Sequence, residues 1–359
     1  MTSQVPSRKP DEHDAKRKRS DGPITLRDVA EQAGVSVSTV SLVLNAKANA
    51  RIGQKTREQV IATAETLGYR PNALAKSLVR GSSKIIGLVT DGIATTPFAG
   101  AIIRGAQEEA WRNGYVLLIA DTSDLSDRAT EAIEKMHDHQ AAGILYSSWY
   151  HHAVQPPRSL QELPTVFVNC FAEGDERPAV LPDEVQGGRL ATELLINQGH
   201  RHVVFINSSE DAPSATGRGA GFEEAVSAVK KTSLKSSIIY IDPGSDSAFA
   251  QAGFLAGMDI LSSSDRPSAV FCYNDRTAMG IYSAAHELGL KIPEDLAVVG
   301  FDDQEVITES MRPKLSTVAL PHYELGSRGV QILLKNINNP DSHSGVERIP
   351  CPAVERQSV

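Results

Sequence analysis

Two polar residues that could bind a hydroxylated ligand stand at the ends of strongly apolar segments. Asn274 follows the apolar run 271–273, and Asp302 follows the aliphatic run 296–301. A carboxylate in such a place can accept hydrogen bonds from two neighbouring hydroxyl groups. Two other interpretations stay open, because Asp302 could form a turn and Asn274 or Asp275 could cap a following helix.

Aromatic and imidazole side chains are further candidates. Trp149 follows the apolar run 143–146, and its ring could stack on a sugar or a base, although plain packing explains it equally well. Four histidines lie close together in pairs, but nearby acids and cysteines complete no known metal-ligand spacing. We therefore expect no metal site and interpret these residues as surface histidines: His137, His139, His151 and His152.

Cysteine usage and the absence of catalytic motifs narrow the class of protein. The three cysteines are scattered and form no Cys-x-x-Cys pair, which argues against a disulfide framework, a zinc finger or an iron–sulfur centre. The chain has no Gly-x-Gly-x-x-Gly after its first apolar run, no phosphate-binding P-loop and no Gly-x-Ser-x-Gly elbow. We expect neither an enzyme nor a bound cofactor.

Charge is divided unevenly along the 359 residues. Residues 1–80 carry 14 Lys and Arg against 8 Asp and Glu, a net +6, whereas residues 81–359 carry 22 against 36, a net −14. A basic head on an acidic body suggests that an anionic polymer binds at one end only. No apolar run approaches the roughly 18 residues of a membrane span, and the basic N-terminus lacks a signal-peptide core, so we expect a cytoplasmic protein.

The basic head predicts three short helices that would position its polar side chains. Thr25 and Ser36 can cap the first two helices, and Gly34 between them lets the second helix leave at a steep angle, as in a helix-turn-helix. A plain helical hairpin without a role in DNA binding is the alternative. The apolar residues recur at helical spacing over 26–33, 37–44 and 54–67.

Two less regular segments flank these helices. Residues 1–22 lack an apolar period and contain four consecutive basic residues at 16–19, so we expect a disordered arm, either a mobile tail or a salt-sensitive phosphate contact. Pro71 begins a short helical segment, 72–79, that ends before Gly81. A helix this short is marginal by itself and would need a partner or a ligand surface.

The remainder of the chain alternates short aliphatic runs with amphipathic helices, which predicts parallel sheets covered by helices. About 275 residues exceed one comfortable core, and residues 183–189 separate two sets of four strands, so we expect two similar lobes with a ligand between them at the carboxyl ends of the strands. The predicted strands are 85–89, 116–120, 143–146, 165–169, 203–206, 237–241, 269–272 and 296–301, and the predicted helices are 101–113, 129–140, 187–198, 219–230, 248–261 and 277–288.

An ordered series of motifs extends from residue 25 to about residue 350. The segments TLRDVAEQAGVS (25–36) and TVSLVLN (39–45) closely resemble the N-terminal signature of the LacI/GalR family of bacterial repressors. The family's third helix, hinge entry and effector-domain motifs are matched by KTR (55–57), LGYRPN (67–72), RGAGF (218–222), ND (274–275) and GFDD (300–303). A stand-alone solute-binding protein would resemble residues 84–350 only, would be exported and would have no use for the basic head.

The resemblance implies an α/β architecture in which a small all-α helix-turn-helix head precedes a two-lobed, periplasmic-binding-protein-like, doubly wound effector domain. It implies a homodimer on a near-palindromic double-stranded DNA operator, and no family-type tetramerising helix is evident. The expected divisions are a disordered basic arm at 1–22, the DNA-binding domain at 23–70, a hinge helix and linker at 71–83, the effector and dimerisation domain at 84–350 and a C-terminal tail at 351–359.

By the same resemblance, Val37, Ser38 and Leu42 face base edges, and Thr39 and Ser41 contact phosphates or bases. Many relatives have arginine in place of Leu42, and leucine would contact thymine methyl groups rather than pair with guanine. Val37 and Leu42 could instead belong to the head's core. Leu78 matches the leucine that wedges between base pairs in the minor groove, or it packs against the partner's hinge. The other candidate DNA-binding residues are Thr25, Ser36, Asn45, Asn72 and Lys76.

The resemblance assigns Arg218 to ligand hydroxyls or a carboxylate, with simple pairing to an acid as the alternative. Phe98 matches a family aromatic, and Asp183 at the lobe crossing is a ligand candidate or a hinge or turn residue. With Trp149, Asn274 and Asp302, these residues make up the expected effector site. We expect a sugar or sugar derivative whose binding changes the lobe arrangement and releases DNA. The alternative is corepression by a purine or nucleoside, or by a phosphorylated protein partner.

Overall fold

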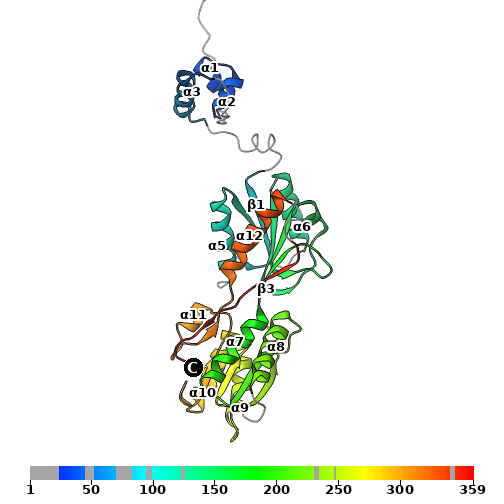
Figure 1. Cartoon of the computed structure of the whole chain (residues 1–359), viewed down its shortest axis with the longest axis vertical. Coiled ribbons are helices and arrows are strands. Elements are labelled where there is room, and N and C mark those ends of the chain that lie inside the picture. Colours follow the sequence, from blue (N-terminus) through cyan, green and yellow to red (C-terminus); the bar gives the residue numbers. More distant parts are fainter. Residues whose placement is uncertain are drawn as a thin grey trace, which may run out of the picture. The chain divides into compact units, whose positions relative to one another are not determined.

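The computed structural model describes residues 24–44, 52–69, 83–93, 99–122, 126–229, 234–245, 248–339 and 344–359. The chain divides into two compact units, Met1–Val79 and Arg80–Val359 (Figure 1). Each unit is described by itself.

The first unit contains the three helices expected from the sequence. Thr25 caps α1 through reciprocal hydrogen bonds with Asp28, and the Ser36 hydroxyl accepts a hydrogen bond of 3.1 Å from the backbone N–H of Thr39 at the start of α2. One buried apolar cluster joins the three helices, so their register is set by a shared core. The helices are α1 (Leu26–Ala33), α2 (Val37–Leu44) and α3 (Gln54–Leu67).

The second unit begins with a lobe built on a parallel sheet in the order β11-β5-β4-β3-β1-β2. Helices α5 and α12 pack together on one face, and α6 with the short 3-10 helix η2 covers the other. The α5–α12 approach requires glycine, because a Cβ on Gly326 would lie 2.0 Å from the carbonyl oxygen of Ile102. The elements are β1 (Ile85–Thr90), α5 (Gly100–Arg112), β2 (Val116–Asp121), α6 (Ser126–Asp138), β3 (Gly143–Ala153), η2 (Arg158–Glu162), β4 (Thr165–Phe171), β5 (Ala179–Pro182), α12 (His322–Asn338) and β11 (Val346–Ile349).

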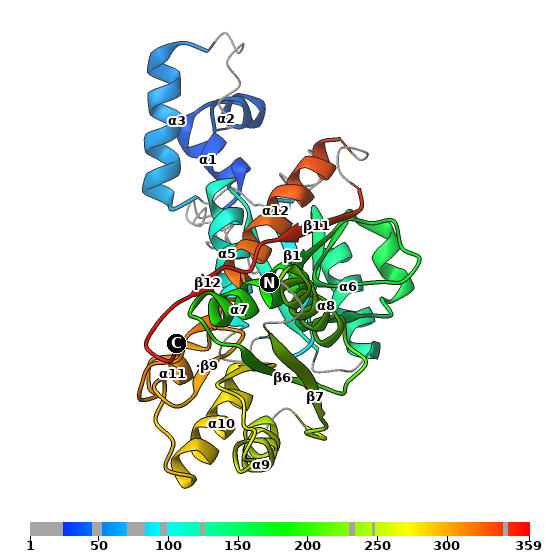
Figure 2. The ribbon, with the colours of Figure 1, turned by 60° about the horizontal axis from the view of Figure 1, so that its bottom comes forward.

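The second lobe has a four-stranded parallel sheet in the order β7-β6-β8-β9. Helix α7 packs beside α8, and α9 packs beside α10 (Figure 2). In the core of this lobe the rings of Phe205 and Phe271 stack with their centroids 4.2 Å apart. The elements are α7 (Glu184–Asn197), β6 (His202–Ser208), α8 (Pro213–Ala228), β7 (Lys235–Ile241), α9 (Phe249–Leu261), β8 (Ala269–Cys272), α10 (Asp275–Glu287), β9 (Ala297–Val299), α11 (Glu305–Thr308), β10 (Thr317–Val318) and β12 (Ala353–Val354).

Three segments of the chain cross between the lobes: β5 leads into α7, β10 leads into α12, and β11 leads into β12. The last crossing places residues 351–359 in the second lobe, where β12 pairs with β10 and the Ser358 hydroxyl donates a hydrogen bond of 2.6 Å to the carbonyl of Val298. The expected tail at these residues is therefore an integrated part of that lobe. The eight predicted strands and six predicted helices of this unit are present, with shifted ends.

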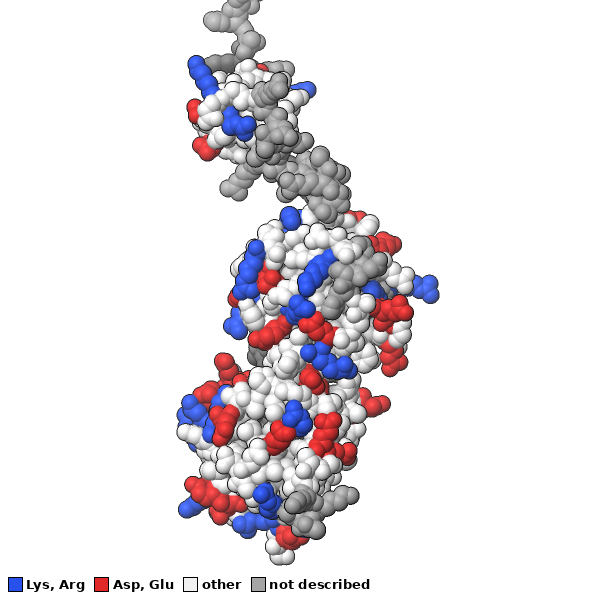
Figure 3. Space-filling view, viewed as in Figure 1, with Lys and Arg blue, Asp and Glu red and all other residues white. Residues whose placement is uncertain are grey.

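One face of the second unit is mixed in charge. On the face seen in Figure 3, acidic and basic side chains are interspersed over both lobes rather than gathered in one patch of a single sign. Among the described residues, no helix combines the length and apolar character needed to span a membrane.

Candidate functional site

A cavity of about 830 Å³ lies between the two lobes of the second unit. Its walls come from the carboxyl-terminal parts of β3 and β4 in the first lobe, from the start of α7 and α8, and from the segment after β8 in the second lobe. Parallel sheets place ligands at this end of their strands, so the cavity lies where the sequence predicted a ligand. Of the six expected effector residues, four line it: Trp149, Arg218, Asn274 and Asp302.

Arg218 projects from α8 and has an exposed fraction of 3%. Its Nε donates a hydrogen bond of 2.9 Å to Oε2 of Glu184, and its Nη2 donates one of 3.4 Å to Oδ1 of Asp302. The guanidinium also donates to the carbonyl of Tyr273 and lies 3.7 Å from the ring centroid of Phe301. Pairing with acids, left open by the sequence, is therefore present in the cavity wall.

Glu184, at the first turn of α7, connects the two lobes electrostatically. Its Oε1 lies 3.5 Å from Nδ1 of His151 on β3, while its Oε2 accepts the hydrogen bond from Arg218. Burial would raise the pKa of the Glu184 carboxyl, but the charges of Arg218 and His151 hold that pKa at about 2. The carboxylate stays ionised and holds Arg218 in place.

Sequence reasoning missed Glu184, and its interpretation of His151 and His152 as surface residues was wrong. The His151 side chain is only 10% exposed, and both imidazoles line the cavity. The reason is the length of β3, which continues to Ala153 rather than ending near residue 146 and so carries the histidines between the lobes. The run of aromatic and imidazole residues at 149–152, shortly after the predicted strand end and without glycine or proline to stop the strand, was the available signal.

Asp302 follows β9 at a point where the backbone is strained. Its φ is +105°, and φ at Asp303 is +55°, a region that residues with a side chain seldom adopt. Burial raises the pKa of the Asp302 carboxyl to about 6, although the charge of Arg218 acts in the opposite direction. Strained backbone and a costly buried carboxylate concentrate at binding sites, which supports a role for Asp302 beyond forming a turn.

Asn274 both caps a helix and lines the cavity. Its Oδ1 accepts hydrogen bonds of 2.8 Å and 2.9 Å from the backbone N–H and the hydroxyl of Thr277, which confirms the capping interpretation. The adjacent Asp275 is fully buried, and burial together with the charge of Asp302 raises its pKa well above the ordinary value. Asp275 receives hydrogen bonds from the Thr317 hydroxyl and the Gln304 backbone N–H, so it supports the cavity wall from behind.

Aromatic rings line the cavity on both lobes. In the first lobe the rings of Trp149 and Tyr150 are 4.6 Å apart, and the carboxylate of Asp91 accepts a hydrogen bond of 3.0 Å from the Trp149 backbone N–H. In the second lobe Phe249 and Tyr273 stack with their centroids 5.3 Å apart. Such surfaces suit the apolar face of a sugar or a planar ring.

Two expected effector residues stand apart from this arrangement. Asp183 caps α7 by accepting a hydrogen bond of 3.0 Å from the Gln186 backbone N–H, and it is not among the residues that line the cavity. The turn interpretation of Asp183 is therefore the one that the structure supports. Phe98 lies outside the described residues.

Helix α2 in the first unit has one face of mixed polar and apolar side chains that does not pack in the core of this unit. Val37 is 42% exposed, Ser38 is exposed and Leu42 is partly exposed, whereas Val40 and Val43 on the opposite face are buried. Val37 and Leu42 do not belong to the buried cluster that joins the three helices. Their side chains are therefore available to a partner. Asn45, Asn72, Lys76 and Leu78 lie outside the described residues.

Within the described part of the chain, no cluster of three or more His, Cys, Asp or Glu side chains has the arrangement of a metal site. His137 and His139 are exposed on and after α6, as the sequence suggested for them. The buried charges of the cavity are instead arranged as hydrogen-bonded ion pairs of Arg218 with Glu184 and Asp302.

Comparison with known proteins gives two family matches, "Bacterial regulatory proteins, lacI family" over residues 25–72 and "Periplasmic binding protein-like domain" over residues 192–359. The chain is 30% identical to the HTH-type transcriptional repressor PurR of Vibrio atlanticus, with 93% of this chain and 98% of that repressor covered. It is 31% identical to the ribose operon repressor of Haemophilus influenzae, with the same coverage of both chains.

Solved structures give the same result. The lac repressor dimer bound to operator and the anti-inducer ONPF has a TM-score of 0.75 and 26% identity, covering 94% of this chain and 99% of that one. A LacI family regulator from Enterococcus faecium with bound ribose has a TM-score of 0.59 and 25% identity, covering 76% of this chain and 98% of that one. The head is a helix-turn-helix, a cavity lies between two parallel-sheet lobes, and the relatives are matched over nearly their whole length. The chain therefore belongs to the LacI family of bacterial DNA-binding transcriptional regulators.

Proposed function

We propose that the chain is a dimeric repressor that binds a near-palindromic operator through α2 and is released from DNA when a sugar binds between its lobes. The observation that carries the proposal is the buried Arg218–Asp302 pair in the wall of the inter-lobe cavity. A guanidinium beside a carboxylate offers donors and acceptors in fixed directions, which suits neighbouring sugar hydroxyls.

The charge of the cavity favours an uncharged ligand over a phosphorylated or carboxylated one. Arg218 is the one Lys or Arg in the cavity wall among the described residues, and Glu184 and Asp302 already neutralise it. Three further acids, Glu173, Glu210 and Asp211, line the cavity and are exposed. An anionic ligand would meet repulsion from this excess of carboxylates, and in the described part of the wall only the imidazoles of His151 and His152 could act as further cations. A sugar would find acceptors and aromatic surface.

D-ribose is the first sugar to test. The ribose operon repressors of Haemophilus influenzae and Escherichia coli are 31% and 32% identical to this chain, and a related regulator has been solved with ribose bound. A purine acting as a corepressor is the second candidate, supported by the 30% identity to PurR and by the aromatic rings on both cavity walls. We propose that the cavity binds its ligand without transforming it.

For DNA, we propose that Val37, Ser38 and Leu42 contact base edges while Thr39 and Ser41 contact bases or the backbone. The support is the exposure of this face and the absence of Val37 and Leu42 from the head's core. Leucine here would favour contact with thymine methyl groups. We propose backbone or supporting roles for Thr25 and Ser36, which cap α1 and α2 at their positive N-terminal ends.

Exposed apolar side chains in the second unit support a dimer. Large apolar side chains are solvent-exposed on the edge strand β2 and on α5, α9, α10 and α11. Val116, Leu118 and Ile119 lie together on the edge strand β2, and clustered exposed apolar side chains mark protein–protein contacts. Two copies that buried this edge would be related by a two-fold axis, matching a near-palindromic operator. The residues include Trp111, Val116, Leu118, Leu255, Met279 and Val306.

The test combines ligand screening with DNA binding. Operators are first selected in vitro from random DNA, and their affinity is measured by fluorescence anisotropy. D-ribose, other sugars, sugar phosphates, purines and nucleosides are then screened for an increase in melting temperature, which ligand binding to the folded state produces.

We expect a neutral sugar to raise the melting temperature and to weaken operator binding. A purine that strengthens operator binding would replace induction with corepression. A sugar phosphate as the tightest ligand would contradict the charge argument, and failure to select any operator would contradict the assignment of α2.

A further inference from the structure

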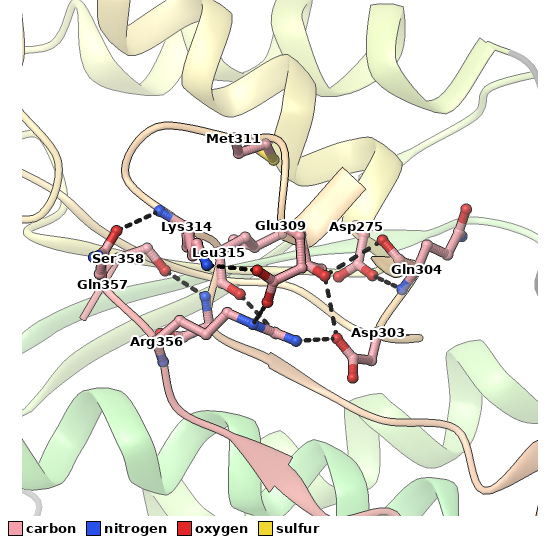
Figure 4. Close-up of polar contacts among 12 residues, drawn as sticks. Asp275, Asp303, Gln304, Glu309, Met311, Lys314, Leu315, Arg356, Gln357 and Ser358 are labelled. Atoms are coloured by element: carbon pink, nitrogen blue, oxygen red, sulfur yellow. Dashed lines mark hydrogen bonds and ion pairs between the residues drawn. The ribbon is translucent and has the colours of Figure 1, made fainter. Parts of the chain in front are cut away.

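Asp302 lies in the cavity wall, and the next residue of the strained segment 302–304, Asp303, is held by Arg356 in the C-terminal segment of the chain (Figure 4). We propose that Arg356 is a positioning residue that fixes this segment, and with it the Asp302 carboxylate, in the geometry that binds the effector. This inference rests on the proposed function of Asp302, but Arg356 itself does not line the cavity.

The segment needs external restraint because its backbone is unfavourable. Positive φ values at both Asp302 and Asp303 place two successive L-residues in a sparsely populated conformation. Such conformations persist only when the surrounding structure specifies them. Without sufficient contacts, the segment would relax, and the Asp302 side chain would move away from Arg218.

Arg356 supplies the restraint through three different nitrogens. Its Nη2 donates a hydrogen bond of 2.7 Å to Oδ1 of Asp303, its Nε donates one of 3.0 Å to Oε1 of Glu309, and its Nη1 donates one of 3.0 Å to the carbonyl of Leu315 (Figure 4). The Arg356 side chain is 12% exposed and that of Asp303 is 20% exposed, so solvent screens this pair less than it screens a surface ion pair. A planar guanidinium can hold all three partners at once, whereas a lysine could not.

The backbone of the C-terminal segment is itself fixed, so Arg356 is a firm anchor. The Arg356 N–H donates to the Ser316 hydroxyl at 2.9 Å, and the neighbouring Gln357 and Ser358 bond to Lys314, Ser316 and Val298. Through these hydrogen bonds, Arg356 fixes Asp303 relative to β9 and β10. The contact between Arg356 and Asp303 therefore connects the C-terminal segment, which lies outside the cavity, to the residue that follows Asp302 in the cavity wall.

Hydrogen bonds of the backbone also hold residues 302–304, but they are made by Asp302 and Gln304 rather than by the side chain of Asp303. The Gln304 N–H donates to Asp275 at 2.7 Å, and the Asp302 N–H donates to the Val318 carbonyl at 2.8 Å. The Thr308 hydroxyl donates a hydrogen bond of 3.2 Å to Asp303, but Thr308 lies in α11, only five residues further along the chain. Removing Arg356 would therefore leave the segment attached but free to relax at Asp303.

Hydrogen–deuterium exchange of the full-length protein tests this restraint without any ligand. The variants are Arg356→Met, which removes the guanidinium, and Asp303→Asn, which removes the carboxylate charge from the pair, together with two controls. Glu309→Gln removes the other carboxylate partner of Arg356, and Arg328→Met breaks a comparable ion pair with Glu347 in the first lobe.

We expect the peptide that spans 300–305 to exchange about tenfold faster or more in the first two variants, and to be unchanged in both controls. Unchanged exchange in Arg356→Met and Asp303→Asn would overturn the proposal. So would an increase of equal size throughout the second lobe, because it would show a general structural role. If Arg356→Met does not fold, Asp303→Asn, which keeps a residue tolerant of positive φ, decides the question.

Calorimetric titration with D-ribose links the restraint to binding. If the wild type binds ribose, we expect Arg356→Met to bind at least about tenfold more weakly, since a hydrogen bond to a charged group has that weight, while Glu309→Gln binds like the wild type. Equal affinity in all three would overturn the proposal. A wild type that does not bind ribose would count against the ribose assignment alone, and the exchange comparison would still decide the role of Arg356.

Discussion

Replacing Asp302 by asparagine should stabilise the protein at neutral and alkaline pH while it impairs effector binding. Asparagine has nearly the same shape but carries no charge. Its Oδ1 can still accept the hydrogen bond from Arg218, and its Nδ2 can donate to the Gln304 amide oxygen once that amide turns over. Burial of the ionised Asp302 carboxylate is a cost that the wild type bears for its binding site.

The size of this cost follows from the pKa. Burial raises the pKa of Asp302 from 3.8 to about 6, and one pKa unit corresponds to about 1.4 kcal/mol, so ionisation lowers the free energy of unfolding by on the order of 3 kcal/mol. Because the pKa is raised on folding, the stabilising contribution of the protonated form is complete below about pH 4 and is lost as the pH rises through about 6. Asp302→Asn should therefore gain stability relative to the wild type across this window.

Urea unfolding at pH 8 and at pH 4 measures the effect, with melting temperatures as a second readout. We expect a gain of roughly 3 kcal/mol at pH 8, or roughly 5–10 °C in melting temperature, and almost no gain at pH 4. Glu210→Gln is the matched control, because Glu210 lines the same cavity but is exposed. A loss of stability in Asp302→Asn at pH 8, or an equal gain at both pH values, would refute the reasoning.

Three further predictions concern other parts of the molecule. Glu184→Gln should lower the free energy of unfolding by about 3 kcal/mol at pH 7, because the pKa of Glu184 falls from 4.5 to about 2 on folding. This loss of stability should shrink as the pH falls from about 4.5 toward 2. Urea unfolding that finds a loss below about 1 kcal/mol at pH 7 would contradict the prediction. Val37→Ala should weaken operator binding in anisotropy assays and leave the amide exchange of α1–α3 unchanged, because Val37 is exposed. Val40→Ala, at a fully buried site, should destabilise the head by about 2 kcal/mol. Equal effects of the two variants on amide exchange would place Val37 in the core. Gly326→Ala should destabilise the first lobe by about 1–3 kcal/mol in urea unfolding because its Cβ would meet a backbone carbonyl, and Gly100→Ala, where a Cβ meets nothing within 4 Å, should not; similar midpoints for the two variants would refute this.

Most regular elements were predictable because the signals that define them are local. Buried parallel strands such as β1 and β6 appear as continuous aliphatic runs, and α1 and α2 appear as apolar periods behind the caps Thr25 and Ser36. The missed elements carry weak local signals. Strand β5 has four residues and ends at Pro182, and β10 and β12 have two residues each. Helix α12 was also missed, although Leu325 and Leu333 are buried on one side of it.

The cavity was predictable in position but not in its charged network. The carboxyl ends of parallel strands define the place, and Arg218, Asn274 and Asp302 were identified from their position in motifs. The pairing of Arg218 with an acid was left open because its partner, Glu184, is 34 positions away. The extension that carries His151 to the cavity is the length of β3, which pairing with β4 determines.

The sequence by itself determined the family, the helix-turn-helix head, the alternation of strands and helices, and the caps of the helices. These features depend on interactions within about four residues, or on motifs that can be read one residue at a time. Only the tertiary structure decided that Glu184 connects His151 to Arg218 and that Arg356 holds Asp303 from 53 positions away. Such contacts depend on how crossing segments return between the lobes, and no local preference of the chain specifies which distant side chain completes a buried ion pair.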